Sequence, residues 1–262
     1  MSYVAVSRDF DTLSAVYDET REPLEPETIQ GLHQFLTTRQ LRSILEVGVG
    51  TGRVALPLTQ LGVGVVGVDA SRGMLGRARA KGLTALVRGN AYRLPFPDRA
   101  FDAALFVHVL HLLDRSDVGL REAARVARSG VLAVLDVPPA GERPEHAAEE
   151  EPRRVVRAIL AEAGFPDLVR SGPRAREQAI LRAHPPTELR VLSDREVTEP
   201  LSKRLDRLEK RAYRHTLTVP PEVLAKAVSE ARARVGSRTV TFRRTEAVAR
   251  WSREAALAAA PP

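Results

Sequence analysis

The sequence has no cysteine among its 262 residues, so disulfide bonds and thiolate metal sites are excluded. It also has no apolar run near the ~20 residues that a helix needs to cross a bilayer. The start of the chain, residues 1–11, lacks the basic and then apolar pattern of a secretory signal. We therefore expect a cytoplasmic protein with no membrane partner. Its length suits one large domain, or a domain with a substantial insertion.

Charge is spread unevenly along the chain. Residues 1–150 carry 17 Lys and Arg against 19 Asp and Glu, whereas residues 151–262 carry 23 against 14. The second half is therefore basic and can attract nucleic acid or an anionic substrate. Net charge alone is weak support for such a partner, because a solvated, Arg-rich surface gives the same numbers.

Short apolar runs alternate with helical patterns over residues 41–137. The runs that predict buried strands are 43–47, 63–69, 85–88, 101–107 and 131–137. Helical patterns lie before and between them, at 9–20, 27–40, 53–61, 71–81 and 117–128, and Gly130 is expected to end the last helix. Strands that alternate with helices indicate a parallel sheet with helices on both faces.

The pattern changes from Pro138 onward. A stretch rich in proline and glutamate predicts an exposed connection. Helices are predicted at 153–163, 201–208 and 223–228, and late strands at 189–197 and 239–242. We interpret this half as two strands that complete the sheet, together with a helical insertion over its ligand edge.

A glycine-rich turn follows the first predicted strand and opens a helix. Its sequence is Glu46-Val47-Gly48-Val49-Gly50-Thr51-Gly52-Arg53. Glycines allow positive φ and let backbone N–H groups approach a ligand closely. A dinucleotide fingerprint would need its third glycine at Arg53, so the spacing here is G-x-G-x-G instead. A tight turn without a ligand is the alternative interpretation.

The second predicted strand ends at Asp69. Ligands of open parallel sheets bind beyond the carboxyl ends of the strands, where a carboxylate can accept hydrogen bonds from both hydroxyls of a ribose. Capping of the next helix is the alternative role, but Ser71 is already placed for it. The glycine turn and Asp69 together indicate a site for an adenosine-bearing cofactor.

Five ordered blocks over residues 41–137 resemble the class I S-adenosylmethionine-dependent methyltransferases, of the small-molecule, type 11-like kind. They are ILEVGVGTGR at 44–53, VVGVDAS at 65–71 followed by Met74, VRGNAYRLPFPDRAFD at 87–102, LFVHVLHLL at 105–113 and GVLAVLDV at 130–137. The resemblance implies S-adenosylmethionine as the cofactor and transfer of its methyl group, by in-line displacement, to a small-molecule acceptor that the sequence does not identify.

The expected fold class is α/β. It is a Rossmann-like, open, mostly parallel sheet of about seven strands with helices on both faces and a helical insertion over the ligand edge. We divide the chain into an N-terminal helical lid at 1–40 and a cofactor-binding core at 41–137. A mainly helical cap at 138–235 and a C-terminal strand and tail at 236–262 follow.

The resemblance implies a role for the glycine turn. Gly48, Gly50 and Gly52 would wrap the methionine portion of the cofactor. Thr51 lies in the same turn, and Glu46 lies nearby.

Further positions would hold the nucleoside. Asp69 would bind the ribose hydroxyls, and Ala70 and Met74 would flank the adenine. Asn90 and Ala91 would meet the adenine edge. Position 90 is usually Asp in the family, but Asn can accept from the adenine amino group and donate to a ring nitrogen. A turn after the third strand is the alternative role for Asn90.

The remaining candidates lie where the reaction would occur. The resemblance implies that the Val107 backbone passes the sulfonium end and that Tyr17 covers the cofactor. His108 and His111 follow the fourth strand and are candidate general bases, because histidine titrates near neutrality. Tyr17 could also orient the substrate, and either histidine could instead be a packing residue. We expect no metal, because the sulfonium already activates the methyl group.

Two other functions stay open. The basic second half could dock RNA or protein, although no RNA-binding module is evident and the (D/N)PP(Y/F) signature of amino-methylating nucleic-acid enzymes is missing after the fourth strand. Alternatively, the chain could bind the cofactor without turnover. His146, His184 and His215 lie in the insertion and are expected at the surface. The sequence leaves monomer or dimer undetermined.

Overall fold

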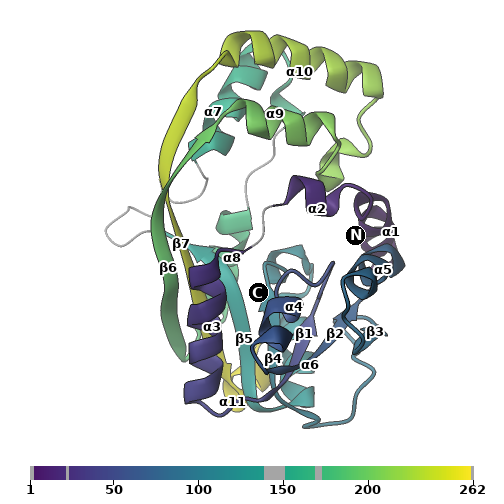
Figure 1. Ribbon diagram of the computed structural model, residues 1–262, viewed down its shortest axis with the longest axis vertical. Helices are drawn as coiled ribbons and strands as arrows, with labels where there is room; N and C mark the ends of the chain where they lie inside the picture. The colour runs from purple at the N-terminus through teal and green to yellow at the C-terminus, as the bar shows by residue number, and fades with distance from the viewer. Residues whose placement is uncertain (1–2, 22–23, 139–150, 169–172, 261–262) are drawn as a thin grey trace.

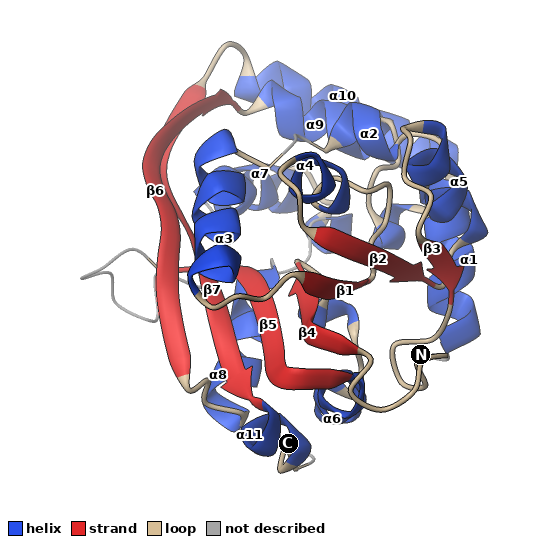
Figure 2. Ribbon diagram, turned by 60° about the horizontal axis from the view of Figure 1, so that its bottom comes forward, coloured by secondary structure: helices blue, strands red, loops and turns tan. Residues whose placement is uncertain are grey.

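A seven-stranded sheet forms the centre of the molecule, shown by a computed structural model that describes residues 3–21, 24–138, 151–168 and 173–260 (Figure 2). The strand order is β3-β2-β1-β4-β5-β7-β6. Five strands are parallel neighbours: β1 (Ser43–Val47), β2 (Gly64–Asp69), β3 (Leu86–Arg88), β4 (Phe101–Val107) and β5 (Ala127–Val137). The two late strands, β6 (Glu188–Pro200) and β7 (Thr239–Ser252), pair antiparallel with each other, and β7 is also antiparallel to β5. The predicted α/β fold is confirmed.

Helices cover both faces of this sheet and bury its apolar side chains. One face packs against α3 (Pro26–Thr38), α4 (Ala55–Gln60) and α5 (Arg72–Ala80). The other packs against α6 (Ser116–Val126), α8 (Pro173–Ala183) and α11 (Arg253–Leu257). The strands between them are apolar on both faces because neither face meets water.

Two helical groups lie beyond the carboxyl ends of the parallel strands (Figure 1). The N-terminal group is α1 (Tyr3–Leu13) and α2 (Tyr17–Thr20). The cap consists of α7 (Glu151–Glu162), α9 (Ser202–Glu209) and α10 (Pro221–Val235), with the short 3₁₀ turns η2 (Pro166–Leu168) and η3 (Arg214–Thr216). A third 3₁₀ turn, η1 (Leu110–Leu112), follows β4. The cap has an apolar core of its own, in which Leu160, Leu201 and Leu205 are fully buried.

The strands β6 and β7 form a long ribbon that links the sheet to the cap (Figure 1). Their register runs from the Glu188–Arg250 pair, in the sheet, to the Pro200–Thr239 pair, beside the cap. The part of the cap from α9 to α10 is therefore carried on the far end of strands whose near end is part of the sheet.

Several sequence predictions differ from the structure in detail. The helix predicted at 9–20 is two helices, and the strand predicted at 239–242 continues to Ser252. The prediction that Gly130 ends a helix is wrong, because it lies inside β5 with φ of 140°. A Cβ there would lie 2.1 Å from the carbonyl oxygen of Trp251, so close approach of β7 requires glycine. The helix α8 was not predicted, and it packs against the sheet rather than within the cap.

Among the residues that the structure describes, no helix has the length and apolar character needed to cross a membrane. The predicted division of the chain at residues 40, 137 and 235 stays a prediction. His146 and most of the connection predicted after Pro138 lie outside the described residues.

Candidate active site

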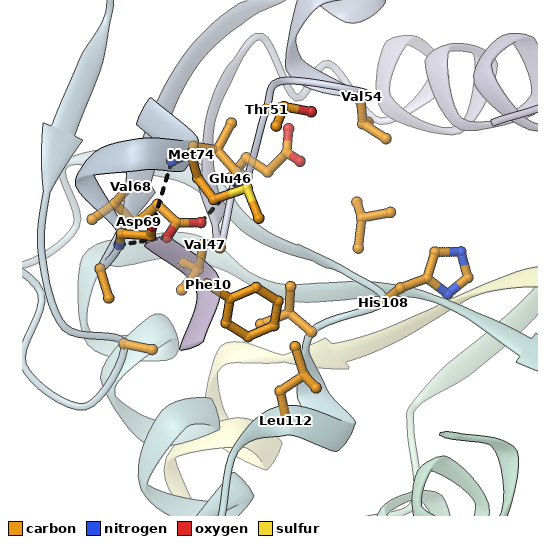
Figure 3. A pocket seen from close by; sticks show the side chains of 18 of the residues that line it. Phe10, Glu46, Val47, Thr51, Val54, Val68, Asp69, Met74, His108 and Leu112 are labelled. Atoms are coloured by element: carbon orange, nitrogen blue, oxygen red, sulfur yellow. Dashed lines mark hydrogen bonds between the residues drawn. The ribbon is translucent and has the colours of Figure 1, made fainter. Parts of the chain in front are cut away.

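A cavity of about 150 Å³ opens at the carboxyl edge of the parallel strands (Figure 3). Its walls come from the segments after β1, β2 and β4 and from the N-terminal helices. Most of the residues predicted from the sequence line it: Tyr17, Glu46, Gly48, Gly50, Thr51, Asp69, Ala70, Met74, Ala91, Val107 and His108. Three predicted residues, Gly52, Asn90 and His111, are not on its wall.

The glycine turn forms one wall through backbone conformations that disfavour side chains. Gly48, Gly50 and Gly52 have φ of 77°, 57° and 80°. A Cβ on Gly48 would lie 2.7 Å from the side chain of Val109, and one on Gly52 would lie 2.3 Å from Leu83. The Cβ of a residue at Gly50 would meet only the Gly48 carbonyl, at 4.0 Å. Gly48 and Gly52 are thus needed for packing, whereas Gly50 keeps space open in the cavity.

Asp69 is tied directly to this turn. Its Oδ2 accepts a hydrogen bond from the Gly50 amide at 2.8 Å, and its Oδ1 accepts one from the Ser71 amide at 2.9 Å. Each carboxylate oxygen keeps a second lone pair that a ligand hydroxyl can use. Burial raises the pKa of Asp69 even though these backbone hydrogen bonds lower it. Ser71 caps α5, as predicted, by accepting from the Met74 amide.

Glu46 lies at the base of the turn and is almost completely buried. Burial and the neighbouring charge of Asp69 raise the pKa of Glu46 to about 8. Its Oε2 is buried and has no hydrogen-bond partner in the described part of the chain. A buried carboxyl oxygen without a partner is costly, so it fits a cationic or hydrogen-bond-donating ligand group in the cavity.

The end of the cavity beside Met74 is mostly apolar. Met74 is 2% exposed, and Phe10 of α1 faces the cavity near it (Figure 3). Ala91 lines the same end, but Asn90 turns its side-chain oxygen to the Tyr92 amide at 2.8 Å. That contact matches the alternative role of Asn90 as a turn residue, and its contact with adenine stays a prediction.

The N-terminal helices are fastened to the cavity rim by two aspartates. Asp11 accepts hydrogen bonds from the Ser71 hydroxyl at 2.6 Å and the Gly73 amide at 2.9 Å. Asp18 accepts one from the Thr51 hydroxyl at 2.6 Å and pairs with Lys81 at 2.6 Å. The predicted lid therefore contacts both the glycine turn and α5.

His108 lies at the end of the cavity opposite Asp69 and Met74 (Figure 3). Its φ is 51°, a strained value for a residue with a side chain. Its Nε2 lies 3.3 Å from Oε1 of Glu246 in β7. Burial lowers the pKa of His108, but the hydrogen bond to Glu246 and the charges of Asp136 and Glu177 raise it to about 9. A histidine that keeps its proton at neutral pH donates a hydrogen bond, which weakens the case for His108 as a general base.

The other candidate histidines that the structure describes do not line the cavity. His111 places its Nδ1 2.8 Å from Oε1 of Glu177, a buried residue of α8. His184 is buried, contrary to the expectation of a surface residue, and accepts from Trp251 through its carbonyl. His215 lies 2.8 Å from the Leu168 carbonyl in the cap.

Sequence reasoning missed several residues of the cavity and its rim. Phe10, Leu24 and Asp114 line the cavity without any motif to mark them, and Leu112 lines it from the block at 105–113 without having been named as a site residue. Asp18 could have been noted, because it follows Tyr17 in the AVYDETR segment.

Comparison with known proteins connects this geometry to a family. The methyltransferase domain family matches residues 45–135, which span β1 through most of β5. A phosphatidylethanolamine N-methyltransferase of Cereibacter sphaeroides is 40% identical over 142 residues, 52% of this chain and 68% of that protein. A demethylmenaquinone methyltransferase of Corynebacterium kroppenstedtii is 35% identical over 130 residues, 48% of this chain and 56% of that protein. The chain therefore spans little more than half the length of the latter relative.

A crystal structure of a protein from Thermotoga maritima has a similar fold. It is described as an S-adenosylmethionine-dependent methyltransferase, possibly a histamine N-methyltransferase. The similarity has a TM-score of 0.50 at 18% identity and covers 96% of this chain and 100% of that chain. At this identity it shows the fold alone. Together with the match to the Cereibacter protein, the family model shows that this chain belongs to the class I S-adenosylmethionine-dependent methyltransferases.

Proposed function

We propose that this chain binds S-adenosylmethionine in the cavity and transfers its methyl group to a small-molecule acceptor. The observation that carries the proposal is the Gly50–Asp69 hydrogen bond of 2.8 Å, which joins the glycine turn to a carboxylate on one rim of the cavity. When bound, the cofactor supplies a methyl group already activated by its sulfonium. The protein's task is then to bind, align and exclude water.

Each proposed contact uses a group described above. Asp69 holds the ribose, and Glu46 faces the cationic end of the cofactor. Gly48 and Gly50 leave room for the methionine portion, and Met74 packs on the adenine.

The acceptor binds at the His108 end, below the cap. Alignment of the acceptor with the methyl–sulfur bond can lower the barrier by roughly 7–11 kcal/mol, so no covalent intermediate is required. Val107 would bring its backbone near the reacting centre, and Tyr17 would cover the site from the lid. The relatives named above act on lipid and quinone acceptors by name, which supports a small molecule over a macromolecule. A cytoplasmic location stays our prediction from the sequence.

Substitution of Asp69 tests the cofactor site. Asp69→Ala should weaken S-adenosylmethionine binding by at least about tenfold, measured by isothermal titration calorimetry, because a hydrogen bond to a charged group is worth roughly 1.5–3 kcal/mol.

Asp102→Ala is the matched control. Asp102 also accepts two backbone hydrogen bonds, from the Arg42 and Ser43 amides at 3.0 and 2.9 Å, but at the opposite edge of the sheet. The Asp102→Ala variant should have a lower melting temperature than the wild type and the same cofactor affinity. Equal cofactor affinity in wild type and a folded Asp69→Ala variant would reject the ribose assignment.

A further inference from the structure

A second cluster of polar side chains meets the acceptor end of the cavity. His108 follows β4, Asp136 lies in β5 and Glu246 lies in β7. One potential metal-ligand atom from each lies within 4.8 Å of the other two. The cofactor contacts proposed above use neither carboxylate of this cluster.

Strand register brings the cluster together. Asp136 and Glu246 are direct partners in the antiparallel β5–β7 pair, so their side chains stand on the same face of the sheet. The His108 amide donates to the Val134 carbonyl at 3.0 Å, which sets His108 beside the end of β5. Carboxylates directly opposite each other repel, and a positive charge beside them, on His108 or on a bound cation, lowers that cost.

A second layer of hydroxyl groups orients Glu246. The Thr28 hydroxyl of α3 donates to Oε2 of Glu246 at 2.5 Å, and the Ser193 hydroxyl lies 2.7 Å from that of Thr28. With Oε2 held in this way, Oε1 faces His108. Hydrogen bonds to the outer oxygen of a ligating carboxylate are typical of metal sites in proteins.

We propose that His108, Asp136 and Glu246 form a binding site for a divalent transition-metal ion such as Mn²⁺ or Zn²⁺. One imidazole and two carboxylates suit such ions and leave further coordination positions open. Ligand bonds of about 2.0–2.2 Å place neighbouring ligand atoms about 3 Å apart. The Nε2–Oε1 distance of 3.3 Å is close to that value. Glu246 is almost buried and His108 is about a quarter exposed, and His108 is the member of the cluster that lines the cavity.

The site's role rests on the proposed methyl transfer and narrows the acceptor to an oxygen nucleophile that can ligate a metal. A metal ion held by these three residues would lower the pKa of an acceptor hydroxyl, whose proton would pass to water. The electron pair of the resulting oxygen anion forms the new bond to the methyl carbon. The carbon–sulfur bond breaks at the same time, and its electron pair stays on sulfur.

Metal binding by the full-length chain tests the site without any turnover. Mn²⁺ alone should bind at one site per chain. Calorimetry and electron paramagnetic resonance measure this binding. Asp136→Asn and Glu246→Gln keep side-chain shape, and each should weaken Mn²⁺ binding by at least about tenfold. His111→Gln is the matched control, because His111 also contacts a carboxylate but lies outside the cluster. It should bind Mn²⁺ as the wild type does.

S-adenosylmethionine binding to the chelator-treated protein separates the two proposals. If S-adenosylmethionine binding persists in the Asp136→Asn and Glu246→Gln variants, those variants are folded and the cofactor site does not depend on the metal site. Wild-type protein that binds neither Mn²⁺ nor Zn²⁺ at about 1 mM would overturn the metal site, since sites in proteins are far tighter. Unchanged Mn²⁺ affinity in both carboxylate variants would overturn it as well.

Discussion

Glu46, which is buried, and Asp69, which is half-buried, are neighbouring acidic residues at one cavity rim. The shift in the pKa of Glu46 to about 8 means that the free protein keeps this carboxyl protonated at neutral pH. A cationic ligand favours the ionised form instead. Cofactor binding should therefore be coupled to loss of a proton from Glu46.

This coupling predicts a pH dependence with a definite sign. Below about pH 8, S-adenosylmethionine binding must displace the proton of Glu46, so affinity should rise with pH and level off above that value. Calorimetry in buffers of different ionisation enthalpy measures the proton released. Glu46→Gln should bind more weakly and show neither the proton release nor this rise. The same rise in the variant would assign it to another group.

At the scale of elements, two glycines with positive φ distinguish the effect of blocked cavity space from the effect of backbone strain. Gly50→Ala should weaken cofactor binding by at least about tenfold, because its methyl group would occupy cavity space, and cost about 1–2 kcal/mol of stability. Gly62→Ala is the control, since Gly62 has φ of 87° and an added Cβ there contacts nothing within 4 Å. It should lower stability, measured by urea unfolding, and leave affinity unchanged. Equal affinity losses in both variants would mean that strain, rather than blocked space, is the cause.

Because α2 contacts the glycine turn, we expect this contact to slow the release of the cofactor from the cavity. Asp18→Ala removes the hydrogen bond from Thr51 and the ion pair with Lys81. The dissociation rate of S-adenosylmethionine in stopped-flow measurements should rise several-fold, with little change in melting temperature. Glu19→Ala is the control, because exposed Glu19 pairs only weakly with Lys210, at 3.4 Å. An unchanged dissociation rate in Asp18→Ala would argue that this segment does not cover the cofactor.

The sequence was most informative where neighbouring residues determine the structure. The apolar runs identified the five parallel strands, the two late strands were predicted over part of their length, and the glycine spacing and Asp69 located the cavity edge. It did not place Asp136 and Glu246 beside His108, because three strands far apart in the chain meet there only through their register. The side-chain direction of Asn90 also depends on a local turn that the motif does not specify. Long strands were underestimated because polar residues interrupt their apolar pattern, at Arg128 and Ser129 in β5 and at residues 243–245 in β7.

At the scale of the whole molecule, several arginines of the basic second half form ion pairs with carboxylates of the protein itself. Arg232 pairs with Asp206 and Glu209 at 2.9 and 2.8 Å, and Arg243 pairs with Asp194 at 2.7 Å. Others reach the first half of the chain, as Arg214 does toward Asp9 at 2.9 Å. These ion pairs indicate that the arginines stabilise the protein's own fold rather than bind phosphate groups.

We therefore expect weak RNA binding. Filter retention of mixed RNA should be low at about 0.15 M salt and should not depend on S-adenosylmethionine. The control is cofactor affinity, which added RNA should leave unchanged. Tight retention that falls steeply as salt rises would instead support the RNA methyltransferase alternative.

The ribbon of β6 and β7 has a consequence for how such a protein can diversify. Its near end is held in register by the sheet, and the segment between its far ends, residues 201–238, is a single excursion of the chain. That excursion can be lengthened, shortened or exchanged while the hydrogen-bond ladder below it stays intact. This part of the cap can therefore change within one continuous stretch, at little risk to the strands that carry the cavity edge.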